Sequence, residues 1–180
     1  MKKIAFIALL LFVATSSFAQ IRSASLTASG LTCSMCSKSI FKSLQKVSFI
    51  QDVKVDIEGS GYELTFKPGT NVVIDDVKKA VEKAGFSVAS LKVTAMFPKT
   101  EIANDAHVTI NGTNLHFLDV KPQTIQGEKT ITIVDKNFLS AKDNKKYSQY
   151  TKMACFHTGM MASCCSKNGQ PSGRIYHVTL

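Results

Sequence analysis

The sequence contains no tryptophan, only four prolines, and 13 acidic residues against 22 basic ones. It also lacks paired catalytic carboxylates, a nucleophilic triad and a glycine-rich phosphate loop, so it predicts a protein that is not an enzyme. The lysines are spread along the chain rather than clustered. We therefore interpret the formal net charge of +9 as a basic, solvated surface, and we expect no nucleic-acid partner.

Long apolar runs are absent except at the amino terminus. Residues 4–13 form an unbroken apolar run behind Lys2 and Lys3, and Ser17-Phe18-Ala19 offers a cleavage site with small residues. This pattern predicts a signal peptide over residues 1–19, and it is too short for a permanent membrane anchor. No cysteine follows Ala19, so a lipid anchor is not expected either. We predict a periplasmic or secreted protein with no stable membrane anchor after cleavage.

Five cysteines follow the predicted signal peptide. An exported location favours their oxidation. Because the number is odd, they cannot all pair with one another inside one chain. At least one thiol is therefore reduced, bound to a metal or paired between molecules.

Two of the thiols, Cys33 and Cys36, lie three positions apart where one pattern gives way to another. Residues 23–28 alternate like a half-buried strand, whereas Cys36, Ile40, Leu44 and Val47 follow helical spacing. The thiols are thus predicted on a loop from strand to helix. Unpaired amides and the positive end of the helix dipole there favour thiolate, the form that binds metals or attacks disulfides.

The spacing alone leaves three interpretations open. Two thiolates supply half of the ligands of a structural zinc site, and they suit a soft ion of low coordination number such as Cu(I) better. A redox-active pair is the second interpretation, and two small packing cysteines are the third.

The next elements predict an antiparallel sheet with two helices. Val53, Val55 and Ile57 alternate, a glycine-rich turn follows, and residues 62–66 alternate again, which predicts a hairpin. Residues 77–84 follow helical spacing and Gly85 is placed as the carboxyl-terminal cap, before a last strand over residues 89–93. Strand, helix, strand, strand, helix and strand in this order predict a ferredoxin-like βαββαβ domain over residues 20–97.

Residues 23–95 resemble the heavy-metal-associated domain family, which includes copper chaperones, modules of copper-transporting ATPases and the periplasmic mercuric-ion-binding protein. The resemblance is carried by residues 30–36, the alternating strands, and residues 82–86. It implies one Cu(I), or another soft ion such as Hg(II) or Zn(II), held by Cys33 and Cys36 and passed to a partner protein by thiolate exchange. Leu31 departs from the family, in which methionine is usual.

Two side chains near the thiols have interpretations of their own. Met35 is expected to point away from the ion, because it lies between the two ligands. Phe86 matches the aromatic residue that caps the loop in this family, and ordinary core packing is compatible with that role.

Residues 96–101 form the predicted joint to a second domain over residues 98–180, with Pro98 inside it. Strands are predicted at 106–110 and 115–117 around an Asn111-Gly112 turn, and at 130–134, 150–157 and 175–180; residues 140–147 form a short helix or a loop. The overall fold class is therefore α+β, with a small, mostly β second domain of barrel or sandwich form, conceivably OB-like.

A second group of soft donors lies in this half, with His177 on the last strand. Its members are Cys155, His157, Met160, Met161, Cys164 and Cys165. Thiolate, thioether and imidazole match copper chemistry, but a disulfide from Cys155 to Cys164 or Cys165 explains the cysteines equally well. His107 and His116 have no neighbour at ligand spacing, and we interpret them as surface or core residues.

The function predicted is an exported soft-metal-binding protein, a metallochaperone or metal-resistance protein. Mercury binding is a variant of it. The alternative is a thiol-disulfide oxidoreductase in which Cys33 attacks and Cys36 resolves. Against that alternative, a thioredoxin-like fold places its CxxC in a longer unit with a cis-proline strand, whereas Pro68 here lies in a turn.

Overall fold

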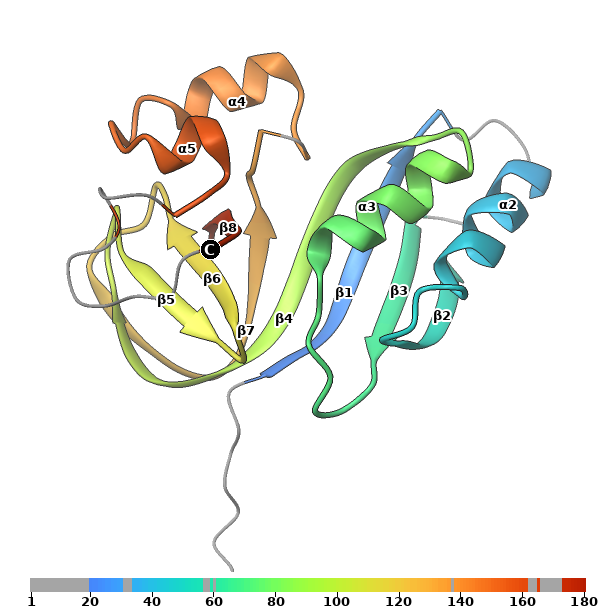
Figure 1. The fold of residues 1–180 in the computed structure, drawn as a ribbon, viewed down its shortest axis with the longest axis horizontal. Coiled ribbons are helices and arrows are strands. Elements are labelled where there is room, and N and C mark those ends of the chain that lie inside the picture. Colours follow the sequence, from blue (N-terminus) through green and yellow to red (C-terminus); the bar gives the residue numbers. More distant parts are fainter. Residues whose placement is uncertain are drawn as a thin grey trace, which may run out of the picture.

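The computed structural model describes residues 20–30, 34–56, 59, 61–136, 138–161, 165 and 173–180. Within them, eight strands form one sheet in the order β2-β3-β1-β4-β7-β8-β6-β5. The helices and strands, shown in Figure 1, are β1 (Gln20–Ser29), α2 (Ser34–Leu44), β2 (Ile50–Asp56), β3 (Gly61–Phe66), α3 (Ile74–Lys83), β4 (Ser87–Ile102), β5 (His107–Ile110), β6 (Thr113–Phe117), β7 (Gln123–Ile133), α4 (Ala141–Tyr147), α5 (Cys155–Thr158) and β8 (Ile175–Thr179).

The first six elements have the predicted βαββαβ order. Strands β2, β3, β1 and β4 are antiparallel neighbours, and α2 and α3 lie side by side on one face of them (Figure 1). Ala24 and Leu26 are buried in β1, and Ile40 and Leu44 are buried in α2. The α+β class and the ferredoxin-like first part are thus confirmed.

Helix α3 is amphipathic as its spacing predicts. Its buried residues are Ile74, Val77, Ala80 and Val81. Asp75 and Asp76 lie in its first turn and Lys83 in its last, where each charge complements the helix dipole. Gly85 follows with φ +88°, a conformation that glycine adopts at low cost, so the predicted end of the helix is confirmed.

The predicted joint at residues 96–101 is wrong, because these residues lie inside β4. The strand pairs with β1 through residues 87–96 and with β7 through residues 92–102. Pro98 is accommodated by an irregularity between Phe97 and Thr100, where the missing amide interrupts no ladder bond. One strand therefore belongs to both halves of the sheet, and the division at residue 97 stays a prediction.

The second half contains the predicted hairpin. Strands β5 and β6 pair around Asn111 and Gly112, which have φ +44° and +79°, the two positive values that a type I′ turn needs. Strand β8 is inserted between β6 and β7, parallel to β6 and antiparallel to β7. The OB-like form of this half stays a prediction.

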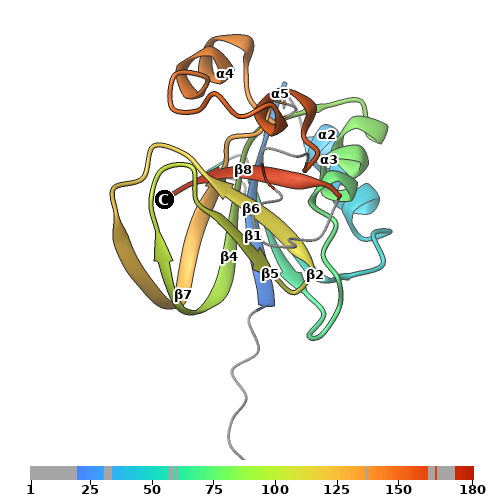
Figure 2. The same cartoon turned by 60° about the vertical axis from the view of Figure 1, so that its left-hand side comes forward.

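The strand predicted over residues 150–157 is wrong. Residues from Cys155 to Thr158 form the short helix α5, which ends at Gly159 with φ +68°. The segment 140–147, predicted as a short helix or a loop, forms helix α4. Ser140 caps this helix by accepting a hydrogen bond from the Asp143 amide. Figure 2 shows α4 and α5 above β8 and β6. Helix α5 packs on the histidines of these strands, because Phe156 contacts the His177 ring at 5.1 Å between centroids and Cys155 Sγ lies 3.8 Å from His116 Nδ1. Among the described helices, none is long and apolar enough to cross a membrane.

Candidate metal centre

Cys36 lies in the first turn of α2 and is half-buried. No acidic residue occurs in that turn, so no carboxylate opposes a thiolate there. The neighbouring Met35 side chain is 80% exposed, in agreement with the expectation that it points into solvent. Cys33 and Leu31 lie outside the described residues.

The face of α2 below Cys36 anchors this turn. Ile40 and Leu44, four and eight positions further on, are completely buried, so Cys36 lies where the buried stripe of the helix meets its amino-terminal end. Tyr62 from β3 donates a hydrogen bond to the Ser37 carbonyl oxygen at 3.2 Å. Burial raises the pKa of the Tyr62 phenol, although its hydrogen bond at Ser37 opposes part of the rise. The phenol therefore stays protonated and continues to hold the first turn.

Phe86 lies at the base of the same loop. It follows α3, packs against the main core, and would be 3.9 Å from a Cβ atom placed on Gly30. Gly30 itself has φ +84°, so the chain leaves β1 in a conformation that favours glycine. Phe86 thus closes one side of the turn from which the CxxC loop starts, which supports the predicted capping role.

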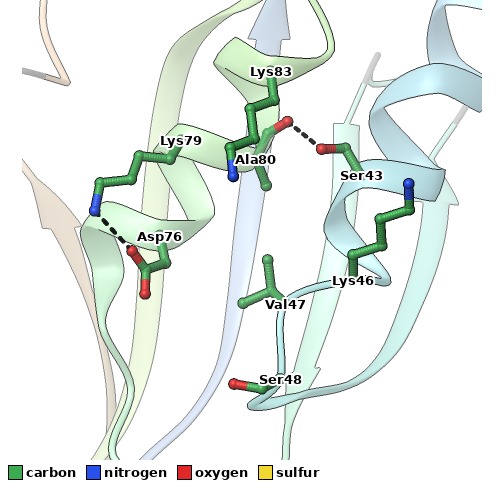
Figure 3. Close-up of a pocket in the computed structure, with 8 residues that line it drawn as sticks. All are labelled: Ser43, Lys46, Val47, Ser48, Asp76, Lys79, Ala80 and Lys83. Atoms are coloured by element: carbon green, nitrogen blue, oxygen red, sulfur yellow. Dashed lines mark hydrogen bonds and ion pairs between the residues drawn. The ribbon is translucent and has the colours of Figure 1, made fainter.

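A hollow of about 440 Å³ lies at the other end of α2, between α2 and α3. Figure 3 shows Lys46, Lys79 and Lys83 around it, with Asp76 paired to Lys79 at 3.0 Å. Ser43 donates to the Ala80 carbonyl oxygen at 2.6 Å and ties the two helices together. The lining offers no soft donor, so this hollow does not extend the candidate metal centre.

The predicted second group of donors is only partly brought together. Cys155 and Cys165 are buried in one cluster with Ile175, and Met153 and Met161 pack against it. In contrast, His157 and Met160 are exposed and do not belong to that cluster. Cys164 lies outside the described residues, and the predicted disulfide stays a prediction.

Cys155 instead faces histidines that have no neighbour at ligand spacing in the sequence. His107 is directly opposite His116 in the β5–β6 pair, and His116 is opposite His177 in the β6–β8 pair. The three rings therefore form a row on one face of the sheet, with centroids 4.3 Å and 5.1 Å apart. Helix α5 covers this row, and Cys155 Sγ lies 3.8 Å from His116 Nδ1. We call His107, His116, His177 and Cys155 the histidine row.

Two carboxylates contact the histidine row, one at its central ring and one at His177. Asp105 Oδ1 is 3.0 Å from His116 Nε2, and Asp135 Oδ2 is 3.2 Å from His177 Nδ1. Burial and the neighbouring histidines lower the pKa of His116 to about 4. Burial opposes the charge of Asp135, but hydrogen bonds from His177 and Arg174 hold the pKa of that carboxyl below its usual value. At neutral pH, His116 is a neutral imidazole with its Nδ1 directed at a thiol.

The sequence did carry a signal for the row. A two-residue turn at Asn111 and Gly112 sets the register of its hairpin, and that register places His107 opposite His116. Spacing along the chain could not show the contact between His116 and Cys155, because 39 positions separate the two residues. In addition, Cys155 lies in a helix where the sequence predicts a strand.

Comparisons with known proteins agree with the βαββαβ part. Residues 25–87 match the sequence model of the heavy-metal-associated domain. This match agrees with the sequence resemblance of residues 23–95 to that family and with the βαββαβ order of the first six elements. No match is found among curated proteins.

Several solved structures are similar to the same part. The oxidised MerP of Ralstonia metallidurans CH34 is 26% identical, with a TM-score of 0.35, and the match covers 39% of this chain and 96% of that one. The CopZ metallochaperone is 19% identical, with a TM-score of 0.34 and coverages of 37% and 98%. A copper-binding domain of the P-type ATPase HMA7 is 28% identical, with a TM-score of 0.34 and coverages of 37% and 89%.

Proposed function

We propose that the protein captures a soft metal ion, Cu(I) in the first place, between Cys33 and Cys36 and transfers it to a partner protein by thiolate exchange. The observation that carries the proposal is the position of Cys36 in the first turn of α2, inside the residues that match the heavy-metal-associated domain. A helix amino terminus stabilises a thiolate, and two thiolates on one short loop suit an ion of low coordination number.

Half-burial of Cys36 suits transfer better than storage. A completely enclosed ion would have to wait for local unfolding before a partner could reach it. A partner thiolate can reach a half-buried Cys36 directly and join the coordination sphere before a first ligand leaves. The exported location predicted from residues 1–19 belongs to the same proposal, and the mass of the protein recovered from the periplasm or medium tests cleavage after Ala19.

The direct test is a titration of the reduced protein with Cu(I) against a competing chelator. We expect the Cys33→Ser/Cys36→Ser variant to lose at least about 100-fold in affinity at the loop, because it removes both thiolate ligands. Met35→Ala is the matched control, since its exposed side chain lies between the two ligands and should leave the affinity unchanged. Equal affinity of the wild type and the double variant would refute the proposal.

Transfer is tested with the protein itself as acceptor. Cu(I)-loaded protein is mixed with an excess of isotope-labelled metal-free protein, and the labelled copies that acquire copper are counted by mass spectrometry over time. Thiolate exchange predicts a rate that rises with the acceptor concentration. A rate independent of acceptor concentration would show that the ion dissociates into solution first.

Hg(II) is a second candidate ion for the same loop. Two thiolates in near-linear arrangement bind Hg(II) as well as Cu(I), and the heavy-metal-associated domain match does not distinguish the two. The same titration repeated with Hg(II), again against the double variant, ranks the two ions.

A further inference from the structure

We propose that the histidine row forms a second, buried metal site, in which Cys155, His107 and His116 bind a copper or zinc ion. One ligand atom from each of these three residues lies within 4.8 Å of the other two. Bonds of about 2.0–2.3 Å from nitrogen and sulfur to a metal ion bring the ligand atoms to within about 4 Å of each other. The distance of 3.8 Å from Cys155 Sγ to His116 Nδ1 already meets that requirement.

Asp105 orients His116 for this role. Its carboxylate is 3.0 Å from His116 Nε2, and an ionised carboxylate only accepts, so Nε2 carries the hydrogen and Nδ1 keeps its lone pair. That lone pair faces the Cys155 sulfur. A carboxylate behind a ligating imidazole is the arrangement that fixes the tautomer in many metal sites.

His107 brings a buried nitrogen without a hydrogen-bond partner among the described residues to the same site. This atom is Nε2, and burial without a partner costs free energy. The ring is stacked on His116 at an interplanar angle of 14° and comes from the edge strand β5. Because His107 is only half-buried, it gives the site an outer end by which an ion can enter.

The same atoms resemble a nucleophilic Cys–His–Asp arrangement, but burial speaks against that use. Cys155 and His116 are both 0% exposed, so a substrate carbonyl could not reach the sulfur. A nucleophilic pair would also leave His107 without a function. A metal ion bound there uses all three donors, which lie within 4.8 Å of one another.

The donors select the class of ion. One thiol and two imidazoles suit zinc and copper, whereas magnesium and calcium prefer oxygen. Cys165, Met153 and Met161 pack in the same cluster as Cys155 and make the surroundings rich in sulfur, which suits copper. None of these donors belongs to the CxxC loop, because Cys36 is carried by α2 at the other end of the sheet (Figure 1).

The experiment uses the full chain with Cys33→Ser and Cys36→Ser, so that the first loop cannot bind. The reduced protein is titrated separately with Zn(II), with Cu(I) against a chelator, and with Co(II) as a spectroscopic probe. We expect one ion per chain, a thiolate-to-Co(II) charge-transfer absorption, and a rise in melting temperature with the tighter-binding ion. The relative affinities for zinc and copper identify the ion.

Three further variants in this background test the ligands. His107→Ala should weaken binding at least about 100-fold, and Asp105→Asn about 10–100-fold, because it removes only the support behind His116. Asparagine also tolerates the positive φ of 63° at position 105. The metal affinity of Asp105→Asn therefore still tests the site if His107→Ala does not fold. His157→Ala is the matched control, an exposed histidine two residues from Cys155, and it should leave affinity unchanged.

Absence of a bound ion in the Cys33→Ser/Cys36→Ser protein would overturn the proposal. Equal affinities of the His107→Ala, Asp105→Asn and His157→Ala variants would also overturn it. These results are independent of the proposed function, because that proposal concerns ions lost on removing Cys33 and Cys36, whereas this one concerns ions retained without them.

Discussion

His116 shows how the environment of one side chain decides its chemistry. Its ring lies between His107 and His177 on the sheet and below Cys155, with Asp105 as its only acidic neighbour among the contacts described. Protonation would place a charge in this buried row. The neutral ring is therefore stabilised by folding, and it is available as a ligand at neutral pH.

A pH dependence of stability follows for the metal-free protein. The pKa of His116 is about 4 when folded and about 6.5 in an unfolded chain, so the unfolded state binds the proton more readily. The contribution of His116 to the free energy of unfolding is fully present above about pH 6.5. It is lost as the pH drops towards about 4, and this loss amounts to about 3 kcal/mol. Urea unfolding of the protein in the presence of a metal chelator, at several pH values, measures this loss of unfolding free energy. A His116→Asn variant should lose less unfolding free energy between about pH 6.5 and 4.

The CxxC loop and the histidine row differ in how far they can be predicted from the sequence. Cys33 and Cys36 were predicted as a site because both ligands lie on one loop, and a loop is local in sequence. His107 and His116 have no neighbour at ligand spacing and are interpreted from the sequence as surface or core residues, because their partner Cys155 comes from a helix that is distant in the sequence. A ligand set assembled across strands becomes visible only when the register of those strands is known.

At the scale of elements, Arg174 before β8 connects the two halves of the chain. It binds Asp75 of α3 through two nitrogens, at 2.8 Å and 3.1 Å, and Asp135 after β7 at 3.0 Å. Its guanidinium also stacks over the Tyr176 ring, 4.4 Å from the ring centroid. The partly buried, two-pronged pair with Asp75 gives this contact more weight than an exposed ion pair.

Asp75→Asn should therefore reduce the free energy of unfolding by about 1–3 kcal/mol, since it removes a charged acceptor of two bonds. Asp76→Asn is the matched control in the same helical turn. Asp76 is more exposed, and among the described residues its side chain pairs with Lys79 alone, so its loss should cost less than about 0.5 kcal/mol. Equal effects in chemical denaturation would show that the Arg174 contact does not stabilise the fold.

The elements were predicted well where periodicity was long and poorly where it was short. Helix α3 and the hairpin β5–β6 follow from their patterns. Residues 150–157 alternate over too short a stretch to separate a strand from a helix, and the structure has the short helix α5 there, ending at Gly159. The sequence predicts a joint at residues 96–101, with Pro98 inside it, because sequence alone does not show that an irregular strand can continue past a proline.

At the scale of the whole molecule, one core runs through both halves. Leu26 and Val81 of the first half and Phe117 and Val178 of the second belong to a single cluster of buried residues. Strand β4 connects them by pairing with β1 on one side and β7 on the other. The halves are therefore expected to depend on each other for stability.

This dependence predicts the behaviour of fragments. Residues 98–180 alone lack the part of β4 that pairs with residues 127–132 of β7, and they should not unfold cooperatively. A fragment of residues 87–180 restores the strand and should be more ordered. Circular dichroism melting and amide NMR dispersion compare the two. A cooperative melt of residues 98–180 equal to that of the longer fragment would contradict the shared core.

The central claim is that Cys33 and Cys36 jointly hold a soft ion. Copper K-edge X-ray absorption of the reduced protein, loaded with less than one equivalent of Cu(I), tests it most directly. The account predicts two sulfur neighbours around copper, one of which is lost in the Cys36→Ser variant. A copper environment of nitrogen or oxygen alone, or a spectrum that Cys36→Ser leaves unchanged, would contradict it.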